Sequence, residues 1–247
     1  MVAHWDTVAS SYAARYGARN HEAHAFRIRQ QRVAELFDKP GGRVLDAGCG
    51  PGIMADYLLG SECEVFGVDI SEEMISECIE RFGASPSAHF SVGKIEDLNF
   101  PDAYFDAVIC MGVVEYIADD ESAVKEMIRV TKPGGTVIVT VPNRLSPHRI
   151  WDRWLYLKAT DAVKALLGRG RRGIFHKEYV TGSYRGLLQS HGLQVTDVVY
   201  YCFRVFPTPL DIFFRRLSVA ICVKLERLAR SRLGWLGTGF IVKAVKT

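Results

Sequence analysis

The sequence predicts an α/β fold built on a doubly wound, mostly parallel sheet. From residue 44 to residue 141, short runs rich in valine and isoleucine alternate with longer segments whose apolar residues recur at helical spacing. The chain has 247 residues, of which 48% are hydrophobic and 24% charged, enough for a complete core. We therefore expect a single domain over residues 1–247.

The expected elements follow in chain order. Two helical segments precede the sheet. The first strand begins at residue 44, and two apolar runs near the end of the chain form a final pair of strands. The helices are expected at 5–16, 21–37, 72–81 and 120–131, and the strands after the first at 63–69, 88–92, 105–112, 136–141, 193–203 and 239–245.

The first strand leads into a glycine-rich turn, V-L-D-A-G-C-G-P-G over residues 44–52. Glycine has no Cβ, so this turn can be sharp and can bring its backbone N–H groups against a ligand. The spacing is G-x-G-x-G, whereas loops that bind a pyrophosphate read G-x-G-x-x-G, and Asp46 would repel a phosphate. The loop therefore favours a ligand that is cationic at this point.

A second carboxylate, Asp69, ends the strand 63–69 and lies 19 residues after Gly50. Dinucleotide-binding folds place an acidic residue about 20 positions beyond their glycine loop, where it binds ribose hydroxyls. Asp69 is therefore predicted to bind a ribose, and it can also cap the helix that starts near Ser71.

With these motifs the chain resembles the class I S-adenosylmethionine-dependent methyltransferases over residues 1–143 and the two closing strands. The resemblance implies a seven-stranded Rossmann-like sheet with an antiparallel edge, S-adenosylmethionine as cofactor and S-adenosylhomocysteine as product. It also implies that Asp46 and the loop near Gly48 and Gly50 hold the methionine end of the cofactor. Asp69 and the adjoining Ile70 would then lie at its ribose.

The resemblance extends to the adenine. Family members commonly have an acidic residue where Lys94 stands, so the adenine amino group would be left to Glu96, a backbone carbonyl or solvent. Ile95 would pack against the ring. Met111, at the end of the fourth strand, would face the methionine portion, although it could equally fill the core.

The helices before the sheet are expected to close over the cofactor, as in related enzymes. Tyr12 and Arg27 are candidates for the side of its carboxylate. The alternative is that Arg27 and Arg29 are solvated charges on an exposed helix face.

Two insertions, 144–185 and 204–236, are expected to form a helical cap over the site. The first holds ten lysine and arginine residues against three acidic ones, and the second seven against two, while the chain as a whole has a net charge of only +3. A basic cap over an acidic body should attract anions or an anionic surface.

The second insertion predicts an amphipathic helix with arginines opposite an apolar stripe. The stripe can pack on the domain, line a substrate pocket or lie in a membrane interface. The first insertion has an aromatic-rich helix followed by a basic run, consistent with an apolar pocket beside an anion site. The stripe of the second insertion contains Leu210, Phe214, Leu217, Ile221, Leu225 and Leu228, and its arginines are Arg215, Arg216, Arg227 and Arg230.

Several partners are not expected. The six cysteines are scattered without a C-x-x-C pair, which predicts neither a disulfide scaffold nor a zinc site and indicates a reducing compartment, the cytoplasm. No uncharged apolar stretch approaches about 20 residues, so no membrane span is expected. The basic residues sit on helices with large apolar faces and without a nucleic-acid-binding module, so nucleic acid is not an expected partner.

The candidate general base is His176, because it follows the first insertion and should reach the rim of the cofactor cleft. The alternative is a histidine that only fixes a cap loop. His148 is a second choice, and Tyr179 could only orient a substrate or base.

The segment 111–117 is similar to that of the ubiquinone-biosynthesis O-methyltransferases, as is the insertion after the fifth strand. Those enzymes have an acidic residue at the place of Gly112 and a histidine at the place of Tyr116, which are associated there with a divalent metal. Glu115 alone is a poor metal site, so we expect no catalytic metal.

The expected function is therefore transfer of a methyl group from S-adenosylmethionine to a small amphiphilic or aromatic acceptor, at oxygen. A secondary metabolite, a quinone precursor and a lipid-like molecule all fit this description. The alternatives are a methyltransferase for an anionic polar metabolite and a cofactor-binding protein held at an anionic membrane.

Overall fold

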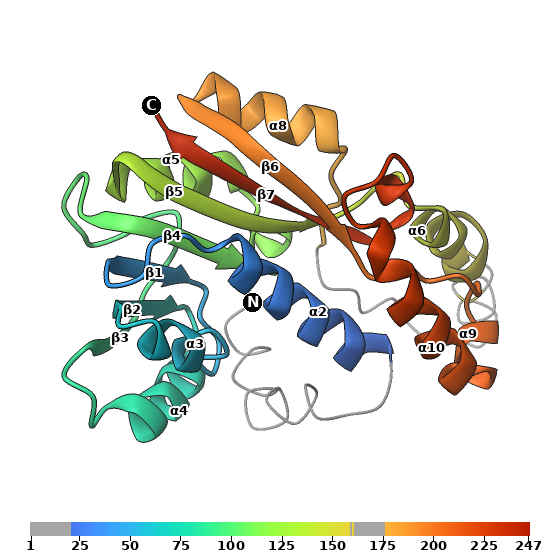
Figure 1. Cartoon of the computed structure of the whole chain (residues 1–247), viewed down its shortest axis with the longest axis horizontal. Helices are drawn as coiled ribbons and strands as arrows, with labels where there is room; N and C mark the ends of the chain where they lie inside the picture. Colours follow the sequence, from blue (N-terminus) through green and yellow to red (C-terminus); the bar gives the residue numbers. More distant parts are fainter. Residues whose placement is uncertain (1–20, 159, 161–175) are drawn as a thin grey trace.

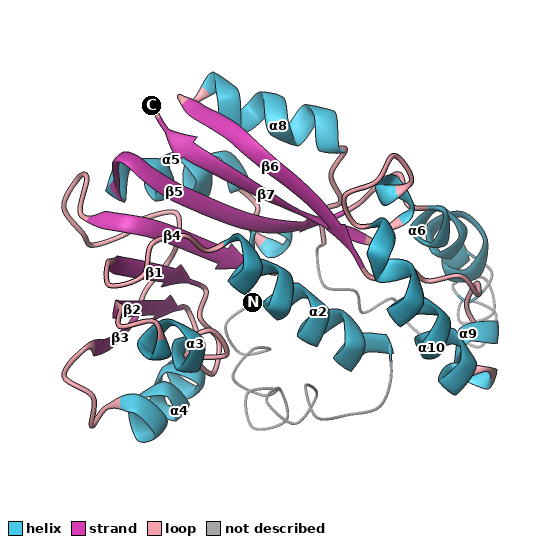
Figure 2. Ribbon diagram, viewed as in Figure 1, coloured by secondary structure: helices cyan, strands magenta, loops and turns pink. Residues whose placement is uncertain are grey.

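The computed structural model describes residues 21–158, 160 and 176–247. At its centre is a seven-stranded sheet with the strand order β3-β2-β1-β4-β5-β7-β6, and helices lie on both of its faces (Figures 1 and 2). The expected α/β class and the single seven-stranded sheet are confirmed.

All neighbouring strands up to β5 are parallel, whereas β7 runs antiparallel to both β5 and β6. The predicted closing pair is therefore present, with β7 between β5 and the edge strand β6. The strands are β1 (Arg43–Ala47), β2 (Glu64–Asp69), β3 (Ala88–Val92), β4 (Phe105–Met111), β5 (Thr131–Pro142), β6 (Leu193–Tyr201) and β7 (Gly239–Lys246).

The two helices predicted between strands, at 72–81 and 120–131, are found to within about one residue, because their ends carry clear signals, whereas the helices at 55–60 and 181–190 were not predicted. The Ser71 hydroxyl accepts a hydrogen bond from the Met74 amide at the start of α4, and Asp119 caps α5 in the same way. The predicted helix at 5–16 lies outside the described residues. The main helices are α2 (His21–Leu36), α3 (Ala55–Gly60), α4 (Glu72–Phe82), α5 (Asp120–Val130) and α8 (Thr181–Ser190).

Alternation along the strands divides the core between the two faces of the sheet. On β1, Val44 belongs to the same buried cluster as residues of α2 and α3, whereas the next residue, Leu45, belongs to the cluster on the other face, which includes residues of α5 and α8. The described N-terminal helix α2 is thus part of one core face, and it runs over the sheet from the carboxyl ends of its central strands toward their amino ends (Figure 1).

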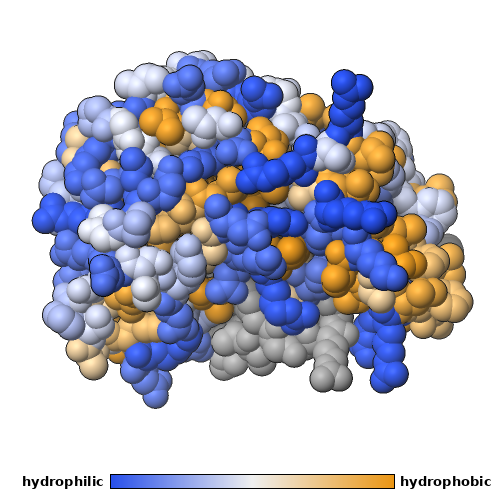
Figure 3. All heavy atoms as spheres, viewed as in Figure 1, coloured by the Kyte–Doolittle hydropathy of each residue, from blue (hydrophilic) through white to orange (hydrophobic). Residues whose placement is uncertain are grey.

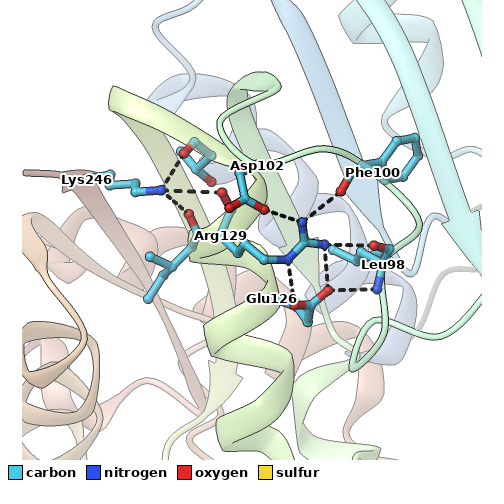
Figure 4. Close-up of polar contacts among 8 residues, drawn as sticks. Leu98, Phe100, Asp102, Glu126, Arg129 and Lys246 are labelled. Atoms are coloured by element: carbon cyan, nitrogen blue, oxygen red, sulfur yellow. Dashed lines mark hydrogen bonds and ion pairs between the residues drawn. The ribbon is translucent and has the colours of Figure 1, made fainter.

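Arg129, in the last turn of α5, ties the strand ends together (Figure 4). Its guanidinium donates hydrogen bonds to the carbonyls of Leu98 and Phe100 and to the carboxylates of Asp102 and Glu126, all at 2.7–2.8 Å. These contacts raise the pKa of the guanidinium. They hold the segment before β4 against α5, which supports the sheet behind the site.

The two insertions lie side by side at one end of the molecule (Figure 1). The Trp151 indole donates a hydrogen bond to the Thr208 carbonyl at 2.9 Å and joins them. The first insertion contains α6 (Pro147–Trp151) and a π-helical turn (Asp152–Tyr156), and the second contains α9 (Leu210–Phe213), α10 (Arg215–Leu225) and two 3-10 turns, η3 (Glu226–Leu228) and η4 (Gly234–Leu236).

The second insertion differs from the prediction in the face that it buries. The helix is broken at Phe214, and Leu210, Phe214 and Leu217 are about half exposed, whereas Leu225 and Leu228 pack half-buried against the core, as predicted. The buried stripe is instead made of small and polar residues at helical spacing, which allow α10 and η3 to approach α2 closely. That stripe contains Ser218, Cys222, Glu226 and Ala229.

Candidate functional site

A pocket of about 310 Å³ opens where β1, β2 and β4 end. Strand order reverses between β1 and β4, and ligands of open α/β sheets bind in the crevice at such a switch point. All eight residues that the sequence predicted for cofactor binding line this pocket: Asp46, Gly48, Gly50, Asp69, Ile70, Ile95, Glu96 and Met111.

Asp46, at the end of β1, is a buried acid of the pocket with a strongly perturbed pKa. Its side chain is only 3% exposed, and among the described residues no hydrogen bond or ion pair to its carboxylate is found. Burial, with a further contribution from nearby Asp69, raises its pKa to about 7. A buried carboxylate without a cationic partner fits a ligand that brings a positive charge.

Asp69, at the end of β2, connects two parts of the pocket. Its Oδ2 accepts a hydrogen bond from the Gly50 amide at 2.9 Å, and its Oδ1 accepts one from the Ser71 amide at 3.0 Å. The carboxylate is therefore held in place, and a carboxylate oxygen is the kind of acceptor that a ribose hydroxyl binds.

The glycine loop shows where a side chain would be excluded. Gly48 has φ +78°, and a Cβ at this position would lie 2.3 Å from Val113. Gly50 has φ +51°, and a Cβ there would meet no atom within 4 Å, so it borders open space.

One expectation about this loop is corrected. Its N–H groups were expected to face the ligand, but the Gly48 and Cys49 amides donate to the Val68 carbonyl at 2.7 and 3.1 Å, and the Gly50 amide donates to Asp69. The donors are used inside the protein, so the glycine loop offers shape and a nearby carboxylate, which again suits a cation.

The opposite side of the pocket is lined by the segment after β3. Ile95 is buried, and Lys94 and Glu96 reach the lining beside it. Met111 lines the pocket at the end of β4 and is half-buried, so it does not merely fill the core.

Arg29 on α2 is the residue that sequence reasoning missed. It is 8% exposed, and a Cβ on Gly112 would lie 2.2 Å from its Nη1, which places the guanidinium against the pocket lining. The neighbouring Gln30 amide donates to the Ile53 carbonyl at 2.9 Å and fastens α2 to the glycine loop. Arg29 lies on the same face of α2 as the buried Val33 and Leu36, at helical spacing. This spacing is the feature of the sequence that could have predicted its burial.

The structure corrects which residue of the helices before the sheet reaches the cofactor pocket. Arg27 is exposed and is not among the residues lining the pocket, whereas Arg29, expected as an alternative to be a solvated charge, is buried. Tyr12 lies outside the described residues.

His176 lies behind the pocket rim. It is not a lining residue, but its ring packs edge-on against Tyr116, which is one, with 5.2 Å between centroids. The adjoining Lys177 amide donates to the Glu115 carbonyl at 2.7 Å and holds this segment against the pocket. Desolvation and the positive charge of Arg149 lower the pKa of His176.

The second-choice general base, His148, and the possible orienting residue, Tyr179, lie away from the pocket. His148 is buried between the insertions, with its ring nitrogens 3.2 Å from Asp152 and 3.8 Å from Asp211. The Tyr179 hydroxyl donates to Asp120 at 2.7 Å, and burial with this contact raises its pKa. Neither lines the pocket, so their geometry is that of cap and loop anchors.

Comparison with known proteins places this pocket in a family. A "Methyltransferase domain" family model matches residues 45–139, which include the glycine loop, Asp69 and Met111. A ubiquinone biosynthesis O-methyltransferase from Xanthomonas campestris is 30% identical over 69% of this chain and 70% of its own length.

Two further relatives are matched over about half of their length. A probable S-adenosylmethionine-dependent methyltransferase from Mycolicibacterium smegmatis is 34% identical over 52% of this chain and 50% of its own. A phosphatidylethanolamine N-methyltransferase from Cereibacter sphaeroides is 34% identical over 44% of this chain and 55% of its own.

Among solved structures, an S-adenosylmethionine-dependent methyltransferase from Thermotoga maritima, described as a possible histamine N-methyltransferase, has the same fold, with a TM-score of 0.65. The two chains are 18% identical, and the likeness covers 100% of both. From these relatives, the matched domain and the seven-stranded sheet, the chain belongs to the class I S-adenosylmethionine-dependent methyltransferases, whose cofactor is S-adenosylmethionine.

Proposed function

We propose that this enzyme methylates a small amphiphilic or aromatic acceptor at oxygen, and that it does so in the cytoplasm with its cap against an anionic membrane. The observation that carries the proposal is an exposed apolar face on the two cap insertions. A quinone precursor, a lipid-like molecule and an aromatic secondary metabolite belong to the class of acceptor that such a face suits.

The pocket fits the cofactor in its charges and its shape. The buried Asp46 carboxylate would hold the cationic methionine end, Arg29 its carboxylate, and Asp69 the ribose hydroxyls, with Ile70 beside it. Ile95 and Glu96 would hold the adenine, and the open space at Gly50 admits the cofactor backbone. When bound, the cofactor supplies an electrophilic methyl group.

The contribution of the protein is then position and proton removal. Tyr116 and Met111 lie on the lining where an acceptor can approach, and His176 packs on Tyr116. We propose that the His176 imidazole takes the proton of the acceptor hydroxyl. Gly112 and Tyr116 add no carboxylate or imidazole to Glu115, so we propose a transfer step without a catalytic metal.

The apolar cap face consists of large side chains from both insertions that point to solvent. Phe213 is 78% exposed and Ile212 63%, and Trp154 on the first insertion is 58% exposed. Figure 3 shows hydrophobic residues gathered at the end of the molecule where α6 and α9 lie. The face comprises Trp151, Trp154, Leu155, Leu210, Ile212, Phe213, Phe214 and Leu217.

Basic residues adjoin the apolar cap face. Arg215 and Arg216 follow it directly on α10 and are exposed, and Lys158 lies 4.3 Å from the Trp154 ring centroid. Apolar side chains bordered by cations match the interface of an anionic bilayer, where the cations meet headgroups. None of the helices in the described part of the chain is long and apolar enough to span a membrane, so the proposed contact is peripheral. The six cysteines are free thiols, which fits a reducing compartment.

The acceptor class is tested with methyl-labelled S-adenosylmethionine and a crude extract as acceptor pool. The label is then partitioned between organic solvent, water and precipitated macromolecules. Label in the organic phase supports an amphiphilic acceptor and gives a product for mass spectrometry. Label that stays in water or in the precipitate contradicts it and favours an anionic polar metabolite or a macromolecule.

The membrane contact is tested by flotation with vesicles in which about one third of the lipid molecules are anionic. We expect Phe213→Ser with Ile212→Ser, or Arg215→Glu with Arg216→Glu, to abolish co-flotation. Matched controls are Ile79→Ser, which changes an exposed isoleucine on α4, and Arg185→Glu, which changes an exposed arginine on α8. Flotation that survives both double substitutions would exclude this face as the contact.

A further inference from the structure

A second cluster of ligand-type side chains lies outside the cofactor pocket, between α2 and the second insertion. We propose that His24, Cys222 and Glu226 bind a Zn²⁺ ion. They come from α2, α10 and η3, and α2 packs against α10 (Figure 1).

The three ligand atoms have the spacing of a small coordination shell. His24 Nε2 lies 3.6 Å from Glu226 Oε1, the Cys222 Sγ lies 4.0 Å from the same oxygen, and all three atoms are within 4.8 Å of one another. Tetrahedral zinc with bonds of about 2.0–2.3 Å needs ligand atoms about 3.3–3.8 Å apart. Shifts of less than about 1 Å in side chains would therefore close the shell.

The polar atoms of this cluster are incompletely satisfied. His24 and Glu226 are 7% and 6% exposed and Cys222 is fully buried, yet within the described part of the chain His24 Nε2 and Glu226 Oε2 have no hydrogen-bond partner. Buried polar atoms are rarely left in this state unless something binds them. A cation between the imidazole, the thiolate and the carboxylate would satisfy all three.

The surroundings orient the ligands. The Cys202 amide donates to Glu226 Oε1 at 2.8 Å, as the outer contacts of metal-binding carboxylates do. The Cys202 thiol adjoins that of Cys222 but does not belong to the group of atoms within 4.8 Å of one another, so it would have to move closer to take the fourth position, which is otherwise open to water.

The donor set decides the metal. One or two thiolates with an imidazole and a single carboxylate suit Zn²⁺, whereas Mg²⁺ and Ca²⁺ require mainly oxygen ligands. The site does not line the cofactor pocket, so its role is structural. It would fasten α2 to the cap, and α2 carries Arg29 five residues beyond His24.

The test uses the full chain, stripped with a chelator and titrated with Co²⁺ as a spectroscopic substitute for Zn²⁺. We expect one equivalent of Co²⁺, an intense near-ultraviolet thiolate-to-cobalt band, and visible bands of tetrahedral strength. One equivalent of Zn²⁺ should bleach these bands and raise the unfolding temperature of the protein.

Variants assign the site. Cys222→Ser should remove most or all of the charge-transfer band, and Glu226→Gln and His24→Gln should each weaken Co²⁺ binding at least about tenfold. The control is Cys63→Ser, because the Cys63 thiol is buried, hydrogen-bonds the backbone carbonyls of Lys39 and Ser61, and does not belong to the proposed ligand group.

The wild-type titration decides the matter even if a variant fails to fold, which circular dichroism would reveal. Absence of a thiolate-to-cobalt band in folded wild-type protein overturns the site. Bands of unchanged strength and affinity in folded Cys222→Ser, or in both folded Glu226→Gln and His24→Gln, would also overturn it.

Discussion

The Asp69 carboxylate accepts a hydrogen bond from the Gly50 amide at 2.9 Å, so the predicted ribose ligand also holds the glycine loop. A second bond, from the Ser71 amide, aligns the same carboxylate with the start of α4. One acidic residue thereby joins the ends of β1 and β2. Its removal should affect both the shape of the pocket and the hydroxyl acceptors within it.

Cofactor binding should depend on pH through Asp46. Its pKa is about 7 in the folded protein, and the ionised form is the one that attracts a cationic cofactor. Affinity for S-adenosylmethionine should therefore rise between pH 5.5 and 7.5 and then level off, which calorimetry can measure.

The effect on stability has the opposite sign. Between pH 3.8, the ordinary pKa of an aspartate, and about pH 7, the folded protein without cofactor keeps a proton on Asp46 that the unfolded chain has lost. The contribution of this group to stability therefore falls as pH rises through that window.

Asp46→Asn should flatten the pH dependence of cofactor affinity, and an unchanged slope in this variant would refute the assignment.

The glycine loop should tolerate a methyl group badly. Gly48 and Gly134 have similar φ values, +78° and +72°, but a Cβ at Gly48 would lie 2.3 Å from Val113, whereas one at Gly134 would meet nothing within 4 Å. Gly134→Ala should cost about 1–2 kcal/mol from backbone strain alone. Gly48→Ala should cost about 1–3 kcal/mol more, because the chain must also move away from Val113. Urea unfolding of the two variants gives the comparison, and equal losses would show that the close contact is easily relieved.

Arg29 should bind the cofactor carboxylate, and Arg27 should not. Loss of a charge-assisted hydrogen bond of about 1.5–3 kcal/mol predicts at least about a tenfold weaker affinity for S-adenosylmethionine in Arg29→Ala. Arg27→Ala, which changes an exposed residue of the same helix, should stay within about twofold.

A ligand without the carboxylate separates this role from a general loss of structure. Methylthioadenosine lacks the amino-acid end, so its affinity should be the same in Arg29→Ala and in the wild-type enzyme. If both ligands are weakened equally, Arg29 supports the fold and does not recognise the carboxylate.

His176 should determine the rate of transfer and leave cofactor binding unchanged. If it is the general base, His176→Ala should lower kcat at least about a hundredfold. Because its pKa is lowered, the acid limb of the kcat profile should fall below the ordinary imidazole value of 6.5. His191→Ala, at the end of α8, is the control. A loss within about threefold in His176→Ala would leave the histidine with a role in the cap loop only.

The pocket was predictable because its residues lie at or just after the ends of successive parallel strands. Asp46 ends an apolar run before glycines, and Asp69 follows a second such run, so parallel strand geometry alone brings them together. Arg29 escaped because a basic residue on an N-terminal helix usually faces solvent, and only the tertiary packing of α2 turns it inward.

The second insertion could not be resolved from its periodicity. The helical wheel favoured burial of all its leucines, but Leu210 and Leu217 are exposed, and close packing with α2 buries Ser218, Cys222 and Glu226 most deeply. The same packing brings together the proposed zinc ligands from segments nearly 200 residues apart. A local motif such as C-x-x-C cannot predict a site of this kind. Competition between two faces of one helix is decided by the partner surface, which a local pattern does not contain.

The central claim is tested most directly by titrating the wild-type protein and Asp69→Asn with S-adenosylmethionine in a calorimeter, with Glu73→Gln on the exposed side of α4 as the control. We expect one cofactor molecule per wild-type chain, unchanged binding in Glu73→Gln, and at least about a tenfold loss in Asp69→Asn, since a ribose acceptor and the loop tether are both impaired. Failure of the folded wild-type protein to bind the cofactor, or full affinity in Asp69→Asn, would contradict the account.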